Sequence, residues 1–406
     1  MEPPLGADHK RWHTVATLGT AQTLAWASSY YLPAMLAAPM ARDLGVSTPA
    51  VFAAFSLALA ISALVGPATG RAIDRWGGRP VLMGTNLVFA GGLLALSQAQ
   101  GPVSMFAAWA LLGLAMGSGL YEAAFAALVR LYGHASRNPI TGITLFAGFA
   151  STVGWPLSAL LELKVGWRGA CLTWAALHLL IGLPLNARLP KAPPAQLLGR
   201  DATQAAQAQS ATPPLQRPLL TAGVLAYVFA ATWFVSTSMA THLPQLLQAC
   251  GATLAVAVGA GALVGPAQVA GRVLEFGLLR RVHPMLSARL AALAHPVGAA
   301  LLLALGAPAA SAFALLHGAG NGIMTIAKGT LPLALFGPQG YGARQGWLTM
   351  PARVAQAAAP FLFGMALQRW GAGALWLSGA LGVSAIAALL LLPGVQPAGK
   401  GAHTPA

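Results

Sequence analysis

The sequence predicts an all-α membrane protein with twelve transmembrane helices, arranged as two pseudo-symmetric six-helix bundles. The chain is 57% hydrophobic and only 8% charged, whereas soluble domains carry about a quarter charged residues. Its apolar residues come in runs of roughly 18 to 25, which is the length of a helix that crosses about 30 Å of hydrocarbon. An internal repeat on either side of one central polar segment supports the division into two bundles.

Twelve apolar segments satisfy this length criterion. Runs such as 111–120 and 380–392 lack the alternation of membrane β-strands, so helices are predicted. Gly, Pro, Gln or Arg interrupt the fifth and eighth segments, which a membrane helix tolerates when its neighbours satisfy the backbone. The expected spans are 14–36, 49–70, 80–99, 103–129, 140–161, 169–187, 218–240, 252–275, 286–306, 309–334, 346–367 and 371–392.

The basic residues between the spans predict the orientation. An even number of spans places both termini on one side. The side that holds the termini carries Lys10, Arg11, Arg71, Arg75, Arg79, Arg130, Arg137, Arg188, Lys191, Arg200, Arg217, Arg280, Arg281, Arg289, Arg344 and Lys400, and the other side carries only Arg42, Lys164, Arg168 and Arg369. We therefore expect an inner (cell) membrane protein with cytoplasmic termini, and we attribute the net charge of +15 to topology rather than to nucleic-acid binding.

The one long polar segment divides the chain into two similar halves. We predict an N-terminal bundle over 1–188, a flexible cytoplasmic linker over 189–217 and a C-terminal bundle over 218–406. The sequence 64–68, Leu-Val-Gly-Pro-Ala, recurs at 263–267, and 70–74, Gly-Arg-Ala-Ile-Asp, is echoed by Gly-Arg-Val-Leu-Glu at 271–275. Two matches in the same order at corresponding helix ends favour duplication.

Several classes of function find no support in the sequence. The two cysteines, Cys171 and Cys250, give neither a disulfide framework nor a thiolate metal site. No nucleophile with a base, no paired acids and no phosphate loop occur at suitable spacing. We therefore expect no enzyme, no cofactor and no metal site, although a receptor built on the same scaffold stays open.

The connection after the second span has a distinctive composition. Gly70 allows helices to approach closely, and Asp74 can face a helix N-terminus or an arginine. Gly77 permits a tight reversal, while Arg75 and Arg79 hold the loop in the cytoplasm.

With its spacing, this segment resembles the signature of the major facilitator superfamily between helices two and three. Gly78 stands in place of the first of the paired basic residues in that signature. The resemblance covers the whole chain once the helix count, the linker and the duplication are included. It implies two bundles that move about a central cavity, with Asp74 locking the cytoplasmic side through the start of helix eleven.

Four charged residues fall inside the spans, namely Glu122, Arg272, Lys328 and Arg353, with Glu275 near a helix end. Inserting a charged side chain at mid-membrane costs on the order of 3 kcal/mol, so we expect each of these residues to have a structural or functional role. Three cations against one acid predict an electropositive cavity. The structural alternative is that Glu122 pairs with Arg272 or Arg353 only to hold helices together.

Polar residues at helical spacing extend this candidate site. Span ten carries His317, Asn321, Thr325 and Lys328 on one face, and the resemblance implies that helices one, four, seven and ten line the cavity. Span seven, with Trp233 and several hydroxyl side chains, is less decisive. The candidate substrate-binding residues are Lys328, Arg353, Asn321, His317, Arg272, Gln22, Trp26 and Tyr30.

Unpaired cations in such a cavity predict a small organic anion as the substrate of a secondary transporter. The segment 141–148 loosely resembles the monocarboxylate-transporter branch of the superfamily, although Gln268 stands where that branch would have an acid. The alternative is a drug/proton antiporter, whose Gly-Pro element is absent at 154–156. Glu122 is the candidate proton-coupling acid in both cases. We expect a monomer in membrane lipid, with no nucleic-acid partner.

Overall fold

The computed structural model describes residues 5–192 and 217–392, and these residues form helices joined by short turns. The helices of the first half are α1 (Leu5–Ala27), α2 (Leu32–Asp43), α3 (Thr48–Trp76), α4 (Gly78–Ser97), α5 (Pro102–Gly119), α6 (Tyr121–Tyr132), α7 (Arg137–Ala147), α8 (Ala150–Leu177) and α9 (Leu183–Ala187). Those of the second half are α11 (Pro218–Ala249), α12 (Leu254–Ala262), α13 (Val264–Gly277), α14 (Pro284–Leu305), α15 (Ala310–Phe336), α16 (Tyr341–Trp370) and α17 (Ala374–Leu391).

Some membrane crossings consist of two helices in line. By length and hydropathy, seven helical stretches of the described chain could span a membrane. Two of these stretches hold several crossings: Pro102–Ala187 is broken by the 3₁₀ turn Gly133–Ser136 and by Gly166, whose φ is 72°, and Tyr341–Leu391 is broken by Gly371–Gly373. Together with α1 followed by α2, and with α15, the crossings formed by residues 5–192 and 217–392 number twelve, which confirms the predicted fold class.

Two stretches escape the hydropathy criterion for a physical reason. The first crossing is divided between α1 and α2, and both α1 and α15 carry polar side chains that reduce their mean hydropathy. Other helices run past the predicted spans, as α11 does by continuing to Ala249. Most of the predicted linker, 193–216, lies outside the described residues, as do Arg200 and Lys400.

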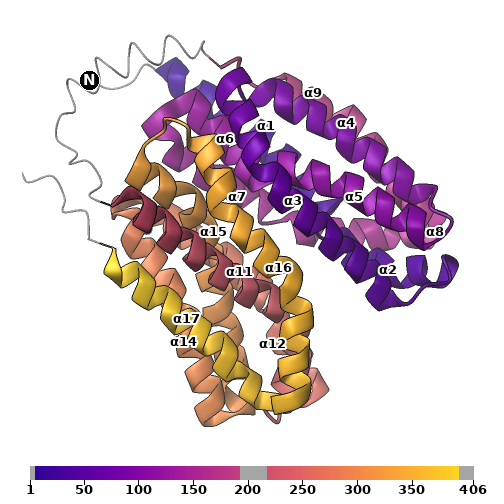
Figure 1. The fold of residues 1–406 in the computed structure, drawn as a ribbon, viewed down its shortest axis with the longest axis vertical. Coiled ribbons are helices and arrows are strands. Elements are labelled where there is room, and N and C mark those ends of the chain that lie inside the picture. Colours follow the sequence, from indigo (N-terminus) through magenta and orange to yellow (C-terminus); the bar gives the residue numbers. More distant parts are fainter. Residues whose placement is uncertain (1–4, 193–216, 393–406) are drawn as a thin grey trace, which may run out of the picture.

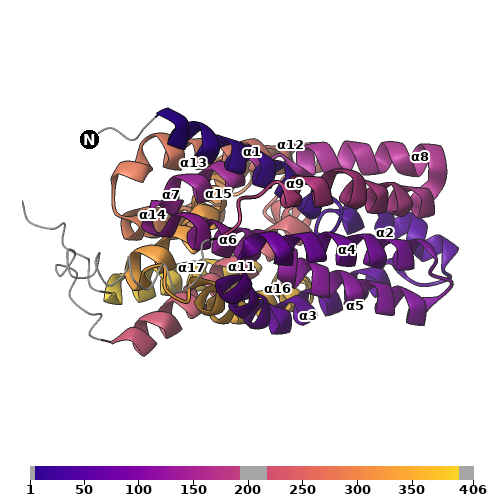
Figure 2. The same cartoon turned by 90° about the horizontal axis from the view of Figure 1, so that it is seen from above.

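The helices form two bundles that contact each other (Figure 1). We call "linker end" the side of the molecule at which α9 ends and α11 begins, and "far end" the opposite side. Figure 1 shows the two halves meeting toward the linker end, while α2 and α8 on one side and α12 on the other lie farther apart. In the view from above, α2 and α8 extend beyond the second half (Figure 2). The principal contacts between the halves are α3 with α16, α7 with α13 and α15, and α6 with α16.

Glycine allows the closest of these approaches. A Cβ atom on Gly70 of α3 would overlap the carbonyl oxygen of Gly342 in α16, and one on Gly346 would overlap the backbone of Gly66 and Pro67. These positions bring the two backbones into direct contact across the boundary between the halves, as the small residues of membrane helices commonly do.

Gly78, which departs from the paired basic residues of the motif, has a similar role within the first half. A Cβ atom at this position would overlap that of Ala127 in α6. We expect Gly78→Ala to lower the free energy of unfolding in detergent by about 1–3 kcal/mol, because two packed helices would have to separate. Gly84→Ala on the same helix is the control, since its Cβ would meet no atom within 4 Å. Equal stability of the two variants would contradict this explanation.

Candidate functional site

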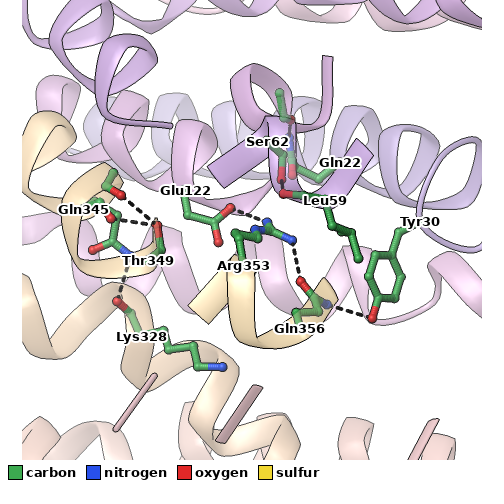
Figure 3. Close-up of polar contacts among 12 residues, drawn as sticks. Gln22, Tyr30, Leu59, Ser62, Glu122, Lys328, Gln345, Thr349, Arg353 and Gln356 are labelled. Carbon is green, nitrogen blue, oxygen red and sulfur yellow. Dashed lines mark hydrogen bonds and ion pairs between the residues drawn. The ribbon is translucent and has the colours of Figure 1, made fainter. Parts of the chain in front are cut away.

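A polar cluster lies between the two bundles, where side chains of the first half meet those of α16 (Figure 3). Its acid, Glu122, occupies the first turn of α6, directly after the chain extends at Leu120. This break places the carboxylate at a helix N-terminus, where the exposed backbone N–H groups favour a negative charge. The break between α5 and α6 therefore gives the site an acid at the N-terminus of a helix.

Arg353 of α16 joins the two halves through this acid. The Arg353 side chain is 4% exposed, and its Nη2 donates to Glu122 Oε2 at 2.8 Å. Its Nη1 donates to Gln356 Oε1 at 3.1 Å, and Gln356 Nε2 donates to the hydroxyl oxygen of Tyr30 at 2.8 Å. The resulting chain of hydrogen bonds runs from α6 through α16 to the turn between α1 and α2 (Figure 3).

Lys328 of α15 is buried beside this chain without an acidic partner. Among residues 5–192 and 217–392, no hydrogen bond or ion pair reaches its ammonium group, although its backbone carbonyl accepts from Gln345 Nε2 at 3.0 Å. The Nζ atom lies 4.3 Å from the ring centroid of Trp233, and Arg353 Cζ lies at the same distance from that ring. A cation–π contact offsets only part of the cost of burying a charge.

Arg272 of α13 lies at another part of the boundary between the halves. It is 6% exposed, and its Nη1 donates to the carbonyl oxygen of Thr144 in α7 at 3.0 Å. Its Nε has no partner, and no acid pairs with it in the described chain. The sequence left Arg272 and Arg353 open as partners of Glu122, and in the structure Glu122 pairs with Arg353.

Aromatic side chains of the first half face this region. The ring of Trp26 lies 4.8 Å from that of Tyr121 and 5.1 Å from that of Tyr30, while Tyr30 lies 5.5 Å from Phe55. Tyr31 completes this aromatic cluster at 5.4 Å from Tyr30. The indole N–H of Trp26 is buried and has no hydrogen-bond partner among the residues that the structure describes.

Gln22, the remaining candidate of span one, serves the packing of the first half. Its Nε2 donates to the carbonyl oxygen of Gly119 at 2.7 Å, at the end of α5. This bond satisfies one of the carbonyls freed where α5 stops before α6. Gln22 thus supports the break that precedes Glu122.

His317 and Asn321 lie apart from Lys328 and Arg353. The ring of His317 meets that of His295 in α14, with 3.1 Å between their Nδ1 atoms. His295, His317 and Asn321 line a small pocket of the second half, together with Thr232 of α11 and Gly382 of α17. The structure therefore does not bring these two candidates together with the cations. Among the described residues, no three His, Cys, Asp or Glu side chains gather to hold a metal.

Two polar contacts join the halves toward the linker end. The Asp74 carboxylate accepts hydrogen bonds from the backbone N–H groups of Gly342 and Ala343, both at 2.9 Å, at the start of α16. Of the basic residues in the motif, Arg75 lies over Trp76 at 5.7 Å and is exposed, while Arg79 is half-buried.

The second contact is an ion pair between Arg137 and Glu275. Arg137 Nη2 donates to Glu275 Oε1 at 3.1 Å, and its two Nη atoms also donate to the carbonyl oxygens of Val282 and Leu279. Burial, followed by the charges of Arg137 and Arg289, lowers the pKa of the nearby His283 ring. The neutral ring accepts the N–H of Met285 at the start of α14.

Residues 18–350 match the family model described as the Major Facilitator Superfamily. The chain belongs to the major facilitator superfamily. Because members of this family are transporters, it is a multi-pass membrane protein that moves a small molecule as a secondary transporter, and not an enzyme.

Two solved structures show the same fold. The human organic anion transporter MFSD10 (TETRAN) is 20% identical, with a TM-score of 0.70, and the match covers 96% of this chain and 100% of that one. The proton:xylose symporter XylE bound to 6-bromo-6-deoxy-D-glucose is 15% identical, with a TM-score of 0.71 and coverage of 95% and 96%. No curated protein sequence matched. At these identities the likeness concerns the fold alone.

In this major facilitator transporter, sequence reasoning missed the place of Trp233 and the pairing of Arg137 with Glu275. Trp233 could not be singled out, because many aromatic side chains face lipid or core and only the fold brings two cations to one ring. A signal for Glu275 existed: it holds the position in the repeated sequence that Asp74 holds in the first copy. Both acids contact the other half of the molecule near the start of a helix.

Proposed function

We propose that this transporter carries a small organic anion, such as a monocarboxylate, and that Lys328 and Arg353 bind its negative group. The observation that carries the proposal is the buried Lys328 ammonium, which has no acidic partner among the described residues. Keeping such a charge buried is costly unless an anion pairs with it. Arg353 adds a planar guanidinium, whose geometry suits a carboxylate.

Charge balance favours an anion over a lipophilic cation. Arg272, Lys328 and Arg353 lie at the boundary between the halves, and among the described residues Arg353 is the only one of these three with an acidic partner, Glu122. The drug/proton antiporter hypothesis needs Glu122 available to a cation, and here its carboxylate pairs with Arg353. The human organic anion transporter with the same fold is consistent with the proposal but does not carry it.

The ion pair between Glu122 and Arg353 suggests how a proton couples to the anion. A carboxylate substrate and Glu122 compete for the same guanidinium. Protonation of Glu122 removes its charge and leaves Arg353 for the substrate, so proton and anion bind together. On this hypothesis the transporter is a proton-coupled symporter, with Glu122 as the coupling residue.

We also propose that the linker end faces the cytoplasm, as the basic residues in the loops predict. The polar contacts of Asp74 and of Arg137 then close the cytoplasmic side, and Gly70 lets α3 and α16 meet there. Among the described residues, the hydrogen bonds between the halves lie at the polar cluster or on its linker side. We take this arrangement to be an outward-facing one.

Asp74→Ala is expected to shift the transporter toward a form that is open at the linker end. The change removes two charge-assisted hydrogen bonds to the start of α16, worth on the order of 1–3 kcal/mol together. Distances between spin labels at the exposed positions Arg71→Cys and Arg281→Cys would report the shift, with longer distances expected in the variant. Asp43→Ala is the control, because Asp43 pairs with Arg168 inside the first half. Unchanged distances in the Asp74 variant would refute the latch.

A thermal-shift screen of the purified protein tests the proposed substrate class, since a ligand that binds the folded state raises its melting temperature. The panel contains small carboxylates, inorganic oxyanions and lipophilic cations. We expect carboxylates to stabilise the protein in a concentration-dependent way and the cations to have no effect. Stabilisation by cations alone would overturn the anion proposal in favour of the antiporter.

A further inference from the structure

We infer that the anion carried by this transporter is an aromatic carboxylate, whose ring stacks on the aromatic cluster of the first half while its carboxylate reaches Lys328 and Arg353. This inference rests on the proposed function, because it assumes an anion site, and adds the chemical nature of the rest of the molecule. The aromatic cluster consists of Trp26, Tyr30, Tyr31, Phe55 and Tyr121.

The aromatic cluster lies against the residues that bind the anion. Tyr30 accepts a hydrogen bond from Gln356, which in turn accepts one from Arg353. Trp233, the ring shared by both cations, packs against the hydrophobic core of the first half. A molecule whose carboxylate replaces Glu122 on Arg353 therefore has its remaining atoms beside rings of α1, α3, α6 and the turn between α1 and α2.

Several of these rings keep part of their surface exposed in the structure. Tyr30, Tyr31 and Phe55 are only half-buried, in contrast to Trp109, the fully buried ring on which Phe55 rests at 5.5 Å. Trp26 is 6% exposed, and its indole N–H is left without an acceptor, which is unusual for a buried donor. Offset and edge-to-face contacts between rings favour a flat aromatic partner over a saturated one of similar size.

Trp233 explains how the site tolerates its unpaired cation before the anion arrives. The faces of one indole ring hold both Lys328 and Arg353 at 4.3 Å. Such contacts are weaker than a charge-assisted hydrogen bond to a carboxylate, so an incoming anion can replace them. Trp233 thus acts as a positioning residue that keeps both cations directed to one place.

Binding of benzoate and cyclohexanecarboxylate to the purified, full-length protein tests the inference, because the two molecules have the same charge and nearly the same size. We expect benzoate to bind about tenfold more tightly in calorimetric titration. Equal affinities, or tighter binding of cyclohexanecarboxylate, would overturn the inference and leave the anion proposal standing. Binding of neither molecule would count against the anion site itself.

Substitutions in the aromatic cluster test whether the cluster causes the preference for benzoate over cyclohexanecarboxylate. Trp26→Leu should reduce the ratio of the two affinities to about twofold or less, while Trp376→Leu, on the exposed face of α17, should leave the ratio unchanged. Phe55→Leu gives a second measurement at a half-buried position, where an apolar side chain is retained. An undiminished preference in both Trp26→Leu and Phe55→Leu would refute the assigned place of the ring.

Discussion

Replacing Lys328 with glutamine is expected to weaken binding of every transported carboxylate by about 100-fold, since a buried charge pair loses one partner. Affinity would be measured by titration of the purified protein, and uptake in proteoliposomes. The melting temperature without ligand should not fall, because the change removes a buried ammonium group that no acid neutralises among the described residues. A loss of binding without a loss of stability is the signature of a functional rather than a structural charge.

The control for this experiment is Lys164→Gln. Lys164 is exposed within α8, just before the break at Gly166, so the same chemical change there should affect neither binding nor uptake. Carboxylate affinity in Lys328→Gln that equals that of the unmodified protein would exclude Lys328 from the substrate site. A large loss of melting temperature would instead assign it to the stability of the bundle.

Glu122→Gln is expected to abolish the dependence of uptake on a proton gradient. In the unmodified protein, an inward proton gradient should stimulate uptake, because protonated Glu122 releases Arg353 to the substrate. Glutamine carries no titrating proton and no charge, so anion binding should be as tight at neutral pH as at acidic pH. Uptake into proteoliposomes with and without an imposed gradient measures the effect.

Glu162→Gln, at a half-buried position of α8 shortly before the break at Gly166, is the matched control and should keep the response to the gradient. Should Glu122→Gln respond to the gradient as the unmodified protein does, Glu122 would have only a structural part in holding α6 to α16. The proposal of an anion site at Lys328 would then continue without this coupling.

The number and order of the crossings could be predicted because they depend on one-dimensional properties of the chain. Hydrophobic length sets the number of crossings, and the basic loops alternate with it. The breaks inside crossings were not predicted: the fourth span was expected as one helix over 103–129, yet α5 ends at Gly119 and α6 begins at Tyr121. That break is decided by packing between helices, and it gives Glu122 its helix N-terminus.

The site could be predicted only in part, because a helical face does not reveal its neighbours. His317 and Lys328 do share one side of α15, as their spacing requires. They are separated by about 16 Å along the helix, however, and the helices beside α15 change over that distance. His317 therefore meets His295 in α14, whereas Lys328 lies against Trp233 of α11.

The polar residues of α16 show the opposite case: Thr349, Arg353 and Gln356 follow one another at i, i+4 and i+7, on one face of the helix. Thr349 and Arg353 both line the same small cavity as Glu122, and Gln356 continues the chain of hydrogen bonds to Tyr30. Because α16 crosses α3 and α6 closely in this region, one of its faces meets the other half over several turns. Periodicity identifies a site where one helix face meets one partner, and it fails where partners alternate.

The most direct test compares carboxylates with their own amides, which have nearly the same shape and lack only the negative charge. Binding of pairs such as acetate with acetamide and benzoate with benzamide would be titrated against the purified protein. If an unpaired cation between the bundles selects the substrate, the carboxylate of at least one pair binds and its amide does not, and Lys328→Gln reduces that difference. Amides that bind as tightly as the acids would contradict the account.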